Sequence, residues 1–122
     1  MKKSSKVFLG AICLLSLTIG FTSCVGTQTL YTWDKYENAS YAYTKEPNEK
    51  NEANLAKCYD KMFEKQGKSY RKVVPPGLCA EKAYMLLKAG KKEEAMQYFD
   101  LEIKNYPESK LFIDRIKKQV EQ

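Results

Sequence analysis

The side chains of this sequence that are best suited to covalent chemistry are its four cysteines. Cys24 stands where an apolar run ends and a stretch of small and polar residues begins, TIGFTSCVGTQ over residues 18–28. A thiol at such a junction can form half of a disulfide, lie buried as a small apolar side chain, or carry a covalently attached lipid. The residues on either side of Cys24 are needed to choose among these three.

The residues before Cys24 have the organisation of a secretory signal peptide. The start MKKSSK is basic, and residues 7–21 form a continuous apolar or weakly polar run. A basic start, a short apolar middle and a small-residue exit are typical of a signal that is removed. The run is shorter than the roughly 20 apolar residues that cross a bilayer. We therefore expect residues 1–23 to be a signal peptide, with an uncleaved anchor as the alternative.

The sequence Phe21-Thr22-Ser23-Cys24 resembles the lipobox of bacterial lipoproteins, in which an aliphatic residue and two small residues precede the cysteine, although Phe21 replaces the usual Leu. The resemblance implies that the Cys24 thiol is diacylated, that the chain is cut before Cys24, and that the new amino group is acylated. Two or more acyl chains give stable membrane attachment, since each buried methylene contributes about 0.8 kcal/mol. We predict lipidation of Cys24, with residues 24–29 as a lipidated tether. An ordinary secreted protein with Cys24 free or paired is the alternative.

The same resemblance predicts the destination. The tether sequence VGTQ has neither an Asp beside Cys24, which retains some lipoproteins in the inner membrane, nor the acidic run that sends others to the cell surface. The expected location in a Gram-negative host is the periplasmic face of the outer membrane.

Composition excludes several classes of function. Loss of the three signal lysines lowers the formal net charge from +6 to +3, and Lys and Glu alternate in stretches such as KAGKKEEAM. Nucleic-acid binding needs a basic stripe, so no nucleic-acid partner is expected. With no histidine and no CxxC spacing, we predict no zinc site, no His-based triad and no cofactor.

The two cysteines of the mature chain that are not at the junction are Cys58 and Cys79. Both fall on helix faces predicted to point inward, which favours buried thiols. The predicted compartment is oxidising, so a Cys58–Cys79 disulfide is the second interpretation.

Apolar spacing predicts an all-α domain over residues 30–122, made of about five helices in antiparallel pairs. Prolines and glycines separate the helices. The expected inward residues of the second helix are Leu55, Cys58, Tyr59, Met62 and Phe63, and those of the last are Phe112, Ile113, Ile116 and Val120. The expected helices lie within residues 30–45, from Asn48 or Asn51 to Gly67, and over residues 78–89, 91–106 and 108–122.

Five aromatic residues between positions 31 and 43 exceed what one helix face can bury. Core packing is the expected role of most of them, with Trp33 and Tyr36 on one helical stripe. Exposed Tyr and Trp are also the residues that dominate protein interfaces. The candidate partner contacts are Tyr31, Trp33, Tyr41, Tyr43, and Tyr70 with Arg71 in the proline-containing loop.

The third and fourth predicted helices resemble a tetratricopeptide repeat, a helix-turn-helix unit of about 34 residues. The matching residues are Ala83, Gly90, Ala95, Phe99 and Pro107, and the departures are Cys79 for Trp, Leu86 for Tyr and Glu102 for a small residue. The resemblance implies close helix packing, which Glu102 is expected to disturb. The first two helices form at most a degenerate partner unit.

A longer resemblance covers nearly the whole mature chain. The segments LYTWDKYENASYAY, VPPGLCAEKAYMLLKAGKKEEAMQYFDLE and YPESKLFIDRI together are similar to a family of small bacterial lipoproteins known only as a domain of unknown function. Genes of that family often lie beside those of a lipoprotein like the curli secretion pore protein and of a third small lipoprotein, which implies an envelope complex. The family has no established activity, so no catalytic residue is implied.

These observations predict a lipid-anchored periplasmic adaptor or scaffold that binds protein partners, including other envelope lipoproteins, and is not an enzyme. A surface-exposed structural lipoprotein or adhesin is the alternative. An enzyme acting on envelope polymers is less well supported, because glycoside hydrolysis needs two converging carboxylates and the acidic residues here are scattered on predicted outer faces.

Overall fold

The structure is a computed structural model that describes residue 26 and residues 28–122. Cys24 and the predicted signal peptide lie outside the described residues. The described part is helical and contains no strand, so the prediction of an all-α domain is confirmed. Its helices are α2 (Tyr36–Lys45), α3 (Glu49–Lys65), α4 (Leu78–Lys88), α5 (Lys92–Asn105) and α6 (Lys110–Glu121), with 3-10 turns at Gln66–Lys68 and Pro107–Ser109. No helix within this part combines the length and the apolar character needed to cross a membrane.

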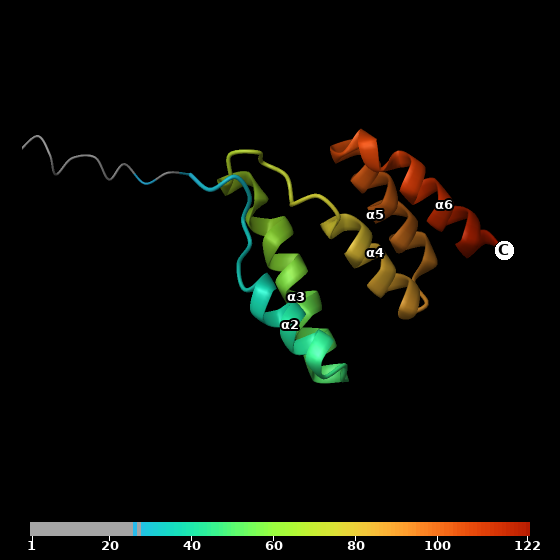
Figure 1. The fold of residues 1–122 in the computed structure, drawn as a ribbon, viewed down its shortest axis with the longest axis horizontal. Coiled ribbons are helices and arrows are strands. Elements are labelled where there is room, and N and C mark those ends of the chain that lie inside the picture. The colour runs from blue at the N-terminus through green and yellow to red at the C-terminus, as the bar shows by residue number, and fades with distance from the viewer. Residues whose placement is uncertain (1–25, 27) are drawn as a thin grey trace, which may run out of the picture.

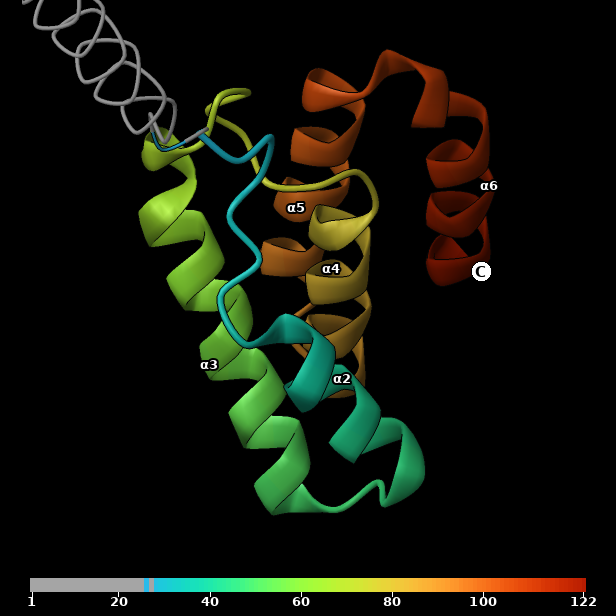
Figure 2. The same ribbon diagram turned by 60° about the vertical axis from the view of Figure 1, so that its left-hand side comes forward.

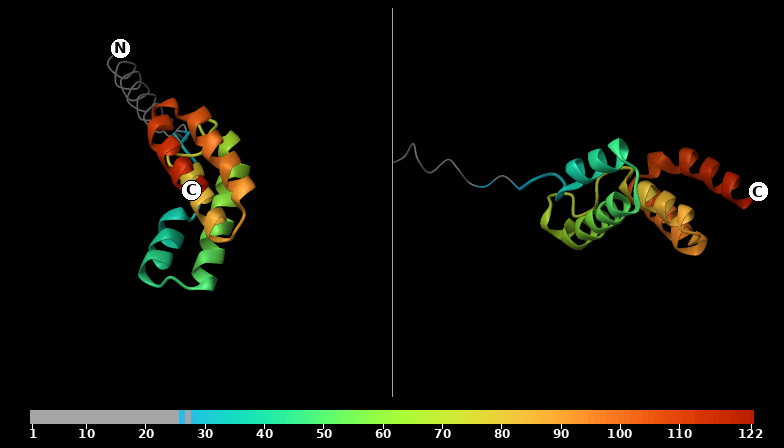
Figure 3. Two further views of the ribbon diagram at one scale, coloured as in Figure 1. Left: turned by 90° about the vertical axis from the view of Figure 1, so that its right-hand side faces the viewer. Right: turned by 90° about the horizontal axis from the view of Figure 1, so that it is seen from below.

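The helices form two antiparallel hairpins and a closing helix (Figure 1). Helix α2 pairs with α3, and α4 pairs with α5, while α6 packs on α5. The hairpins meet where α3 contacts α4. The view from below in Figure 3 shows that they diverge from this contact, so that the array is open rather than a closed bundle.

The turn between α2 and α3 is fixed by two asparagines. The Asn48 side chain accepts a hydrogen bond from the Asn51 backbone N–H at 2.9 Å, which makes Asn48 the N-cap of α3. The Asn51 side chain donates to the Glu46 carbonyl oxygen at 2.8 Å. Of the two caps that the sequence allowed, the structure uses Asn48, and Asn51 closes the turn from inside the helix.

The predicted first helix forms within residues 30–45, but the expectation that Trp33 shares a helical stripe with Tyr36 is wrong. Helix α2 begins at Tyr36, and Trp33 lies before it because the backbone of Asp34 takes a positive φ of 46°. The Asp34 carboxylate pairs with Lys65 Nζ at 2.5 Å, and this ion pair lowers the pKa of Asp34. Trp33 is therefore not on a helical stripe with Tyr36 and is 51% exposed.

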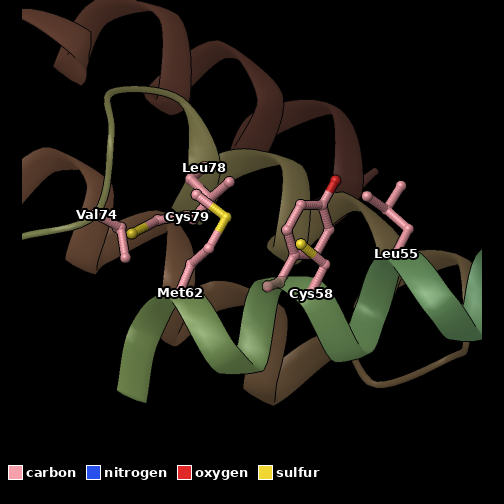
Figure 4. Close-up of a cluster of buried hydrophobic side chains, with 7 residues drawn as sticks. Leu55, Cys58, Met62, Val74, Leu78 and Cys79 are labelled. Carbon is pink, nitrogen blue, oxygen red and sulfur yellow. The ribbon is translucent and has the colours of Figure 1, made fainter. Parts of the chain in front are cut away.

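One core cluster joins α3 to the start of α4 (Figure 4). Its members are Leu55, Cys58, Tyr59, Met62, Val74, Leu78 and Cys79. Cys58 and Cys79 are both buried with free thiols. Burial is the main cause that raises the pKa of Cys58, and burial together with the nearby Glu102 carboxylate raises the pKa of Cys79 to about 12.

A second core cluster holds α4, α5 and α6 together and contains Ala83, Ala95, Phe99 and Ile113. The prediction that Phe112 faces inward with Ile113 is wrong, because Phe112 is 62% exposed while Ile113 is 0% exposed. Neighbouring residues of a helix with 3.6 residues per turn point in directions about 100° apart. Only one of the two can occupy the core, and the structure places Ile113 there.

The loop before α4 is held by Glu102 of α5 and by Tyr106, the residue that follows α5. Glu102 Oε1 accepts the Gly77 N–H at 2.7 Å, and the Tyr106 hydroxyl donates to the Val74 carbonyl oxygen at 2.7 Å. The Tyr106 N–H donates to the Glu102 carbonyl oxygen at 2.8 Å, which keeps Tyr106 one turn beyond Glu102, and both side chains reach the same loop. Glu102 is 1% exposed, and its Oε2 has no hydrogen-bond partner among the described residues. The expectation that Glu102 disturbs the packing is wrong, because this side chain binds the start of α4.

Candidate binding groove

The open side of the array forms a groove of about 570 Å³ between α2, α4 and α6. Its floor includes Tyr59 and Phe99 from the helices behind. The groove exists because the first helix of each hairpin and α6 line the same side, while α3 and α5 lie behind them. Figure 1 shows α4 between α2 and α6.

Aromatic side chains line this groove, which we call the aromatic groove. Tyr84 on α4 is 61% exposed and Phe112 on α6 is 62% exposed, and both lie along its wall with Tyr36 and Tyr43 from α2. Large apolar side chains left in water are free to bury surface against a partner. Because Phe112 points outward, the core has one aromatic side chain fewer. The same orientation allows Phe112 to line the groove on the α6 side.

A carboxylate lies among these rings. Glu81 on α4 accepts hydrogen bonds from the Tyr36 hydroxyl at 2.9 and 3.0 Å and from the Tyr59 hydroxyl at 2.9 Å. Burial and the Glu81 charge raise the pKa of both tyrosines, so both phenols stay protonated donors. No cation of the described chain pairs with Glu81. The two tyrosine hydroxyls therefore fix the position of the Glu81 carboxylate, and its negative charge can pair with a cation of a binding partner.

The groove also contains a cation, Lys88, which lies on α4 two helical turns from Glu81. Lys88 Nζ donates to the Tyr43 hydroxyl at 2.9 Å and lies 5.6 Å from the centre of that ring. The hydrogen bond from Lys88 to Tyr43 raises the pKa of Lys88. Within residues 28–122 no carboxylate comes within ion-pair distance of Lys88. Lys88 is seven positions after Glu81 on α4, which corresponds to about 10 Å along the helix.

The back of the molecule offers a contrast. A cavity of about 910 Å³ lies between α3 and the α4–α5 hairpin, and Lys82 is one of the residues that line it. The Lys82 ammonium pairs with Asp60 at 2.5 Å and lies 5.0 Å from the Phe63 ring centre and 4.6 Å from that of Tyr98. The charge and the rings on this side already have partners within the chain. The aromatic groove is therefore the better candidate for a binding site.

The structure distributes the sequence-predicted contacts over three surfaces. Tyr43 lines the aromatic groove, whereas Tyr41 and Trp33 lie together on the outer side of α2. Tyr31 precedes α2, and Tyr70 and Arg71 are in the α3–α4 loop. The groove residues that sequence reasoning missed are Glu81, Tyr84, Lys88 and Phe112. The available signal was adjacency, since Tyr84 follows the inward Ala83 and so must point elsewhere.

These features define an all-helical domain of paired helices with one open aromatic groove. The chain belongs to the family DUF4810, a domain of unknown function, whose sequence profile matches residues 30–116. No curated protein and no solved structure matches the chain.

Proposed function

We propose that this protein is a lipid-anchored adaptor of the bacterial envelope that holds a segment of a partner protein in its aromatic groove. The observation that carries the proposal is the groove itself, with exposed aromatic walls and two fixed charges of opposite sign. The lipid at Cys24, the cleavage of residues 1–23 and the periplasmic face of the outer membrane rest on the sequence pattern described above. The expected partner is another envelope lipoprotein.

A tetratricopeptide-like arrangement supports this role. Ala83 and Ala95 are 0% exposed and Phe99 is 1% exposed, as the packing of that repeat requires. Stacked helix pairs create extended concave surfaces that bind other proteins. Here the groove is lined by α2, α4 and α6.

The charges define the chemistry of the partner segment. A basic side chain opposite Glu81 and an acidic one opposite Lys88, about 10 Å apart, would match the groove. Apolar side chains between them would cover Tyr84 and Phe112. Because the tyrosines already hold Glu81 and Lys88 in position, the chain gives up little side-chain entropy when it binds.

Site-specific photocrosslinking in intact cells tests the groove. A photoreactive amino acid is placed at Tyr84 or at Phe112, with Lys57 as a control because it is exposed on α3 outside the groove. We expect one partner, identified by mass spectrometry, to be captured from both groove positions and not from Lys57. Equal capture from Lys57, or none from the groove positions, would overturn the proposal.

Two charge variants extend the test. Glu81→Gln keeps an acceptor oxygen for Tyr36 and Tyr59 but removes the negative charge, and Lys88→Gln removes the positive one. Each is expected to reduce capture of the same partner, while Lys57→Gln leaves it unchanged. Capture that both groove variants retain in full would exclude the charge match.

The anchor is tested separately. Cys24→Ala should release the protein from the membrane fraction into the soluble periplasmic fraction, and the intact mass of the native protein should show an acylated Cys24. A Cys24→Ala protein that stays with membranes after a salt wash would contradict the lipid anchor without affecting the groove.

A further inference from the structure

The end of the domain nearest the proposed anchor is fixed by hydrogen bonds. The Tyr70 N–H donates to the Thr29 carbonyl oxygen at 3.0 Å, and the Arg71 N–H donates to that of Leu30 at 3.2 Å. The Gln28 side chain donates to the Lys68 carbonyl oxygen at 2.7 Å. Residues 28–30 are thus bound to the α3–α4 loop, at one end of the domain (Figure 2).

Covalent geometry keeps this end close to residue 24. Gln28 is four positions after Cys24, and a chain spans at most about 3.6 Å per position. A lipid on Cys24 therefore holds Gln28 within about 14 Å of the acylated residue. The loop to which residues 28–30 are bound must lie near the same bilayer.

The composition of this end suits a bilayer surface. Leu30 is 53% exposed and Tyr70 is 71% exposed. Lys68, Arg71 and Lys72 are exposed, and none forms an ion pair within the part of the chain that the structure describes. We call these five residues the tether-side face. Tyr is enriched at membrane interfaces because one end of its ring is apolar and the other polar.

We propose that the tether-side face lies against the bilayer and binds anionic phospholipid headgroups, which orients the domain on its anchor. Each of the three cations is expected to gain about fivefold in partition to an anionic surface. The α2–α3 turn is at the opposite end of the domain (Figure 2), so in the proposed orientation it points away from the bilayer. This inference rests on the proposed anchor at Cys24.

The test supplies the anchor chemically. The mature chain starting at Cys24 is coupled through that thiol to a maleimide lipid in vesicles of phosphatidylethanolamine with phosphatidylglycerol. Cys58 and Cys79 are 4% and 0% exposed, which protects both from the maleimide. Because the anchor is supplied chemically, a failure of this test contradicts only the proposal that the tether-side face binds the bilayer. An unmodified Cys24 in the native protein would instead contradict the proposed natural lipid anchor.

The readout is tryptophan emission. Trp33, the one tryptophan of the sequence, is removed as Trp33→Phe, and Tyr70→Trp is compared with Tyr41→Trp. Tyr41 is a matched control on α2 because it is 68% exposed against 71% for Tyr70. Brominated lipids should quench the emission of the Tyr70→Trp variant and leave that of the Tyr41→Trp variant unchanged. Equal quenching of the two, or none of either, overturns the proposal.

The role of charge is tested by two triple variants of equal net charge. Replacing the three cations of the tether-side face by Gln should reduce the quenching of the Tyr70→Trp variant. Replacing three exposed lysines elsewhere by Gln should leave the quenching unchanged. Circular dichroism is used to check that both triple variants are folded. Quenching that survives the first triple unchanged overturns the binding of anionic headgroups. The control lysines are Lys45, Lys50 and Lys57.

Discussion

Replacing Glu102 by Ala should destabilise the domain, although the repeat pattern has a small residue at this position. Its Oε1 accepts the Gly77 N–H at 2.7 Å, and the side chain is 1% exposed. A hydrogen bond to a charged group contributes about 1.5–3 kcal/mol, and removing the acceptor also leaves a donor unpaired. With the cavity left by the side chain, we expect Glu102→Ala to lower the free energy of unfolding by about 2–4 kcal/mol.

That loss would be a large share of the 5–15 kcal/mol typical of a domain, so it is measurable. The assay is urea unfolding of the unlipidated Cys24→Ala mature chain, followed by far-UV circular dichroism. Glu102→Gln keeps an acceptor oxygen and should lose only about 1 kcal/mol. Glu64→Ala, at an exposed glutamate of α3, is the control and should change stability by less than about 0.5 kcal/mol. If Glu102→Ala were neutral or stabilising, a small residue would suit this position, as the repeat pattern has it. The conclusion that the Glu102 side chain stabilises the start of α4 would then be refuted.

Three further predictions concern local features of the fold. Gly90 has a φ of +76°, so Gly90→Ala should cost about 1–2 kcal/mol in urea unfolding, whereas Gly67→Ala, at a position with open space and no positive φ, should not destabilise. Asn48→Ala should cost about 1 kcal/mol through the lost N-cap, with Asn38→Ala on the exposed surface of α2 as the neutral comparison. The pKa of Cys79 is raised from 9.0 to about 12, so the stability that its protonated thiol contributes is complete below pH 9.0 and is lost as pH rises toward about 12. Unfolding measured across this range should show a smaller alkaline loss for Cys79→Ala, and an identical slope for both proteins would contradict the burial of this thiol.

Local sequence signals determined the helices of this protein. Asn48 provided a cap, Gly90 ended α4 and Pro107 ended α5, because capping and the missing N–H of proline act within a few residues. Apolar spacing, also a local signal, predicted the inward residues of α3. The placement of Trp33 on a stripe with Tyr36 was wrong, because the positive φ of Asp34, whose side chain contacts the distant Lys65, cannot be read from spacing.

The binding site was decided by tertiary structure. Periodicity shows which residues share a helix face, but not which of two adjacent apolar residues finds a partner helix, so Phe112 was placed in the core when it lines the aromatic groove. Glu81 and Lys88 looked like solvated charges until α2 brought Tyr36 and Tyr43 against them. By itself, the sequence determined helices, turns and the pattern around Cys24. The relative placement of helices far apart in the chain determined the groove, because its walls come from three segments that meet only when both hairpins pack.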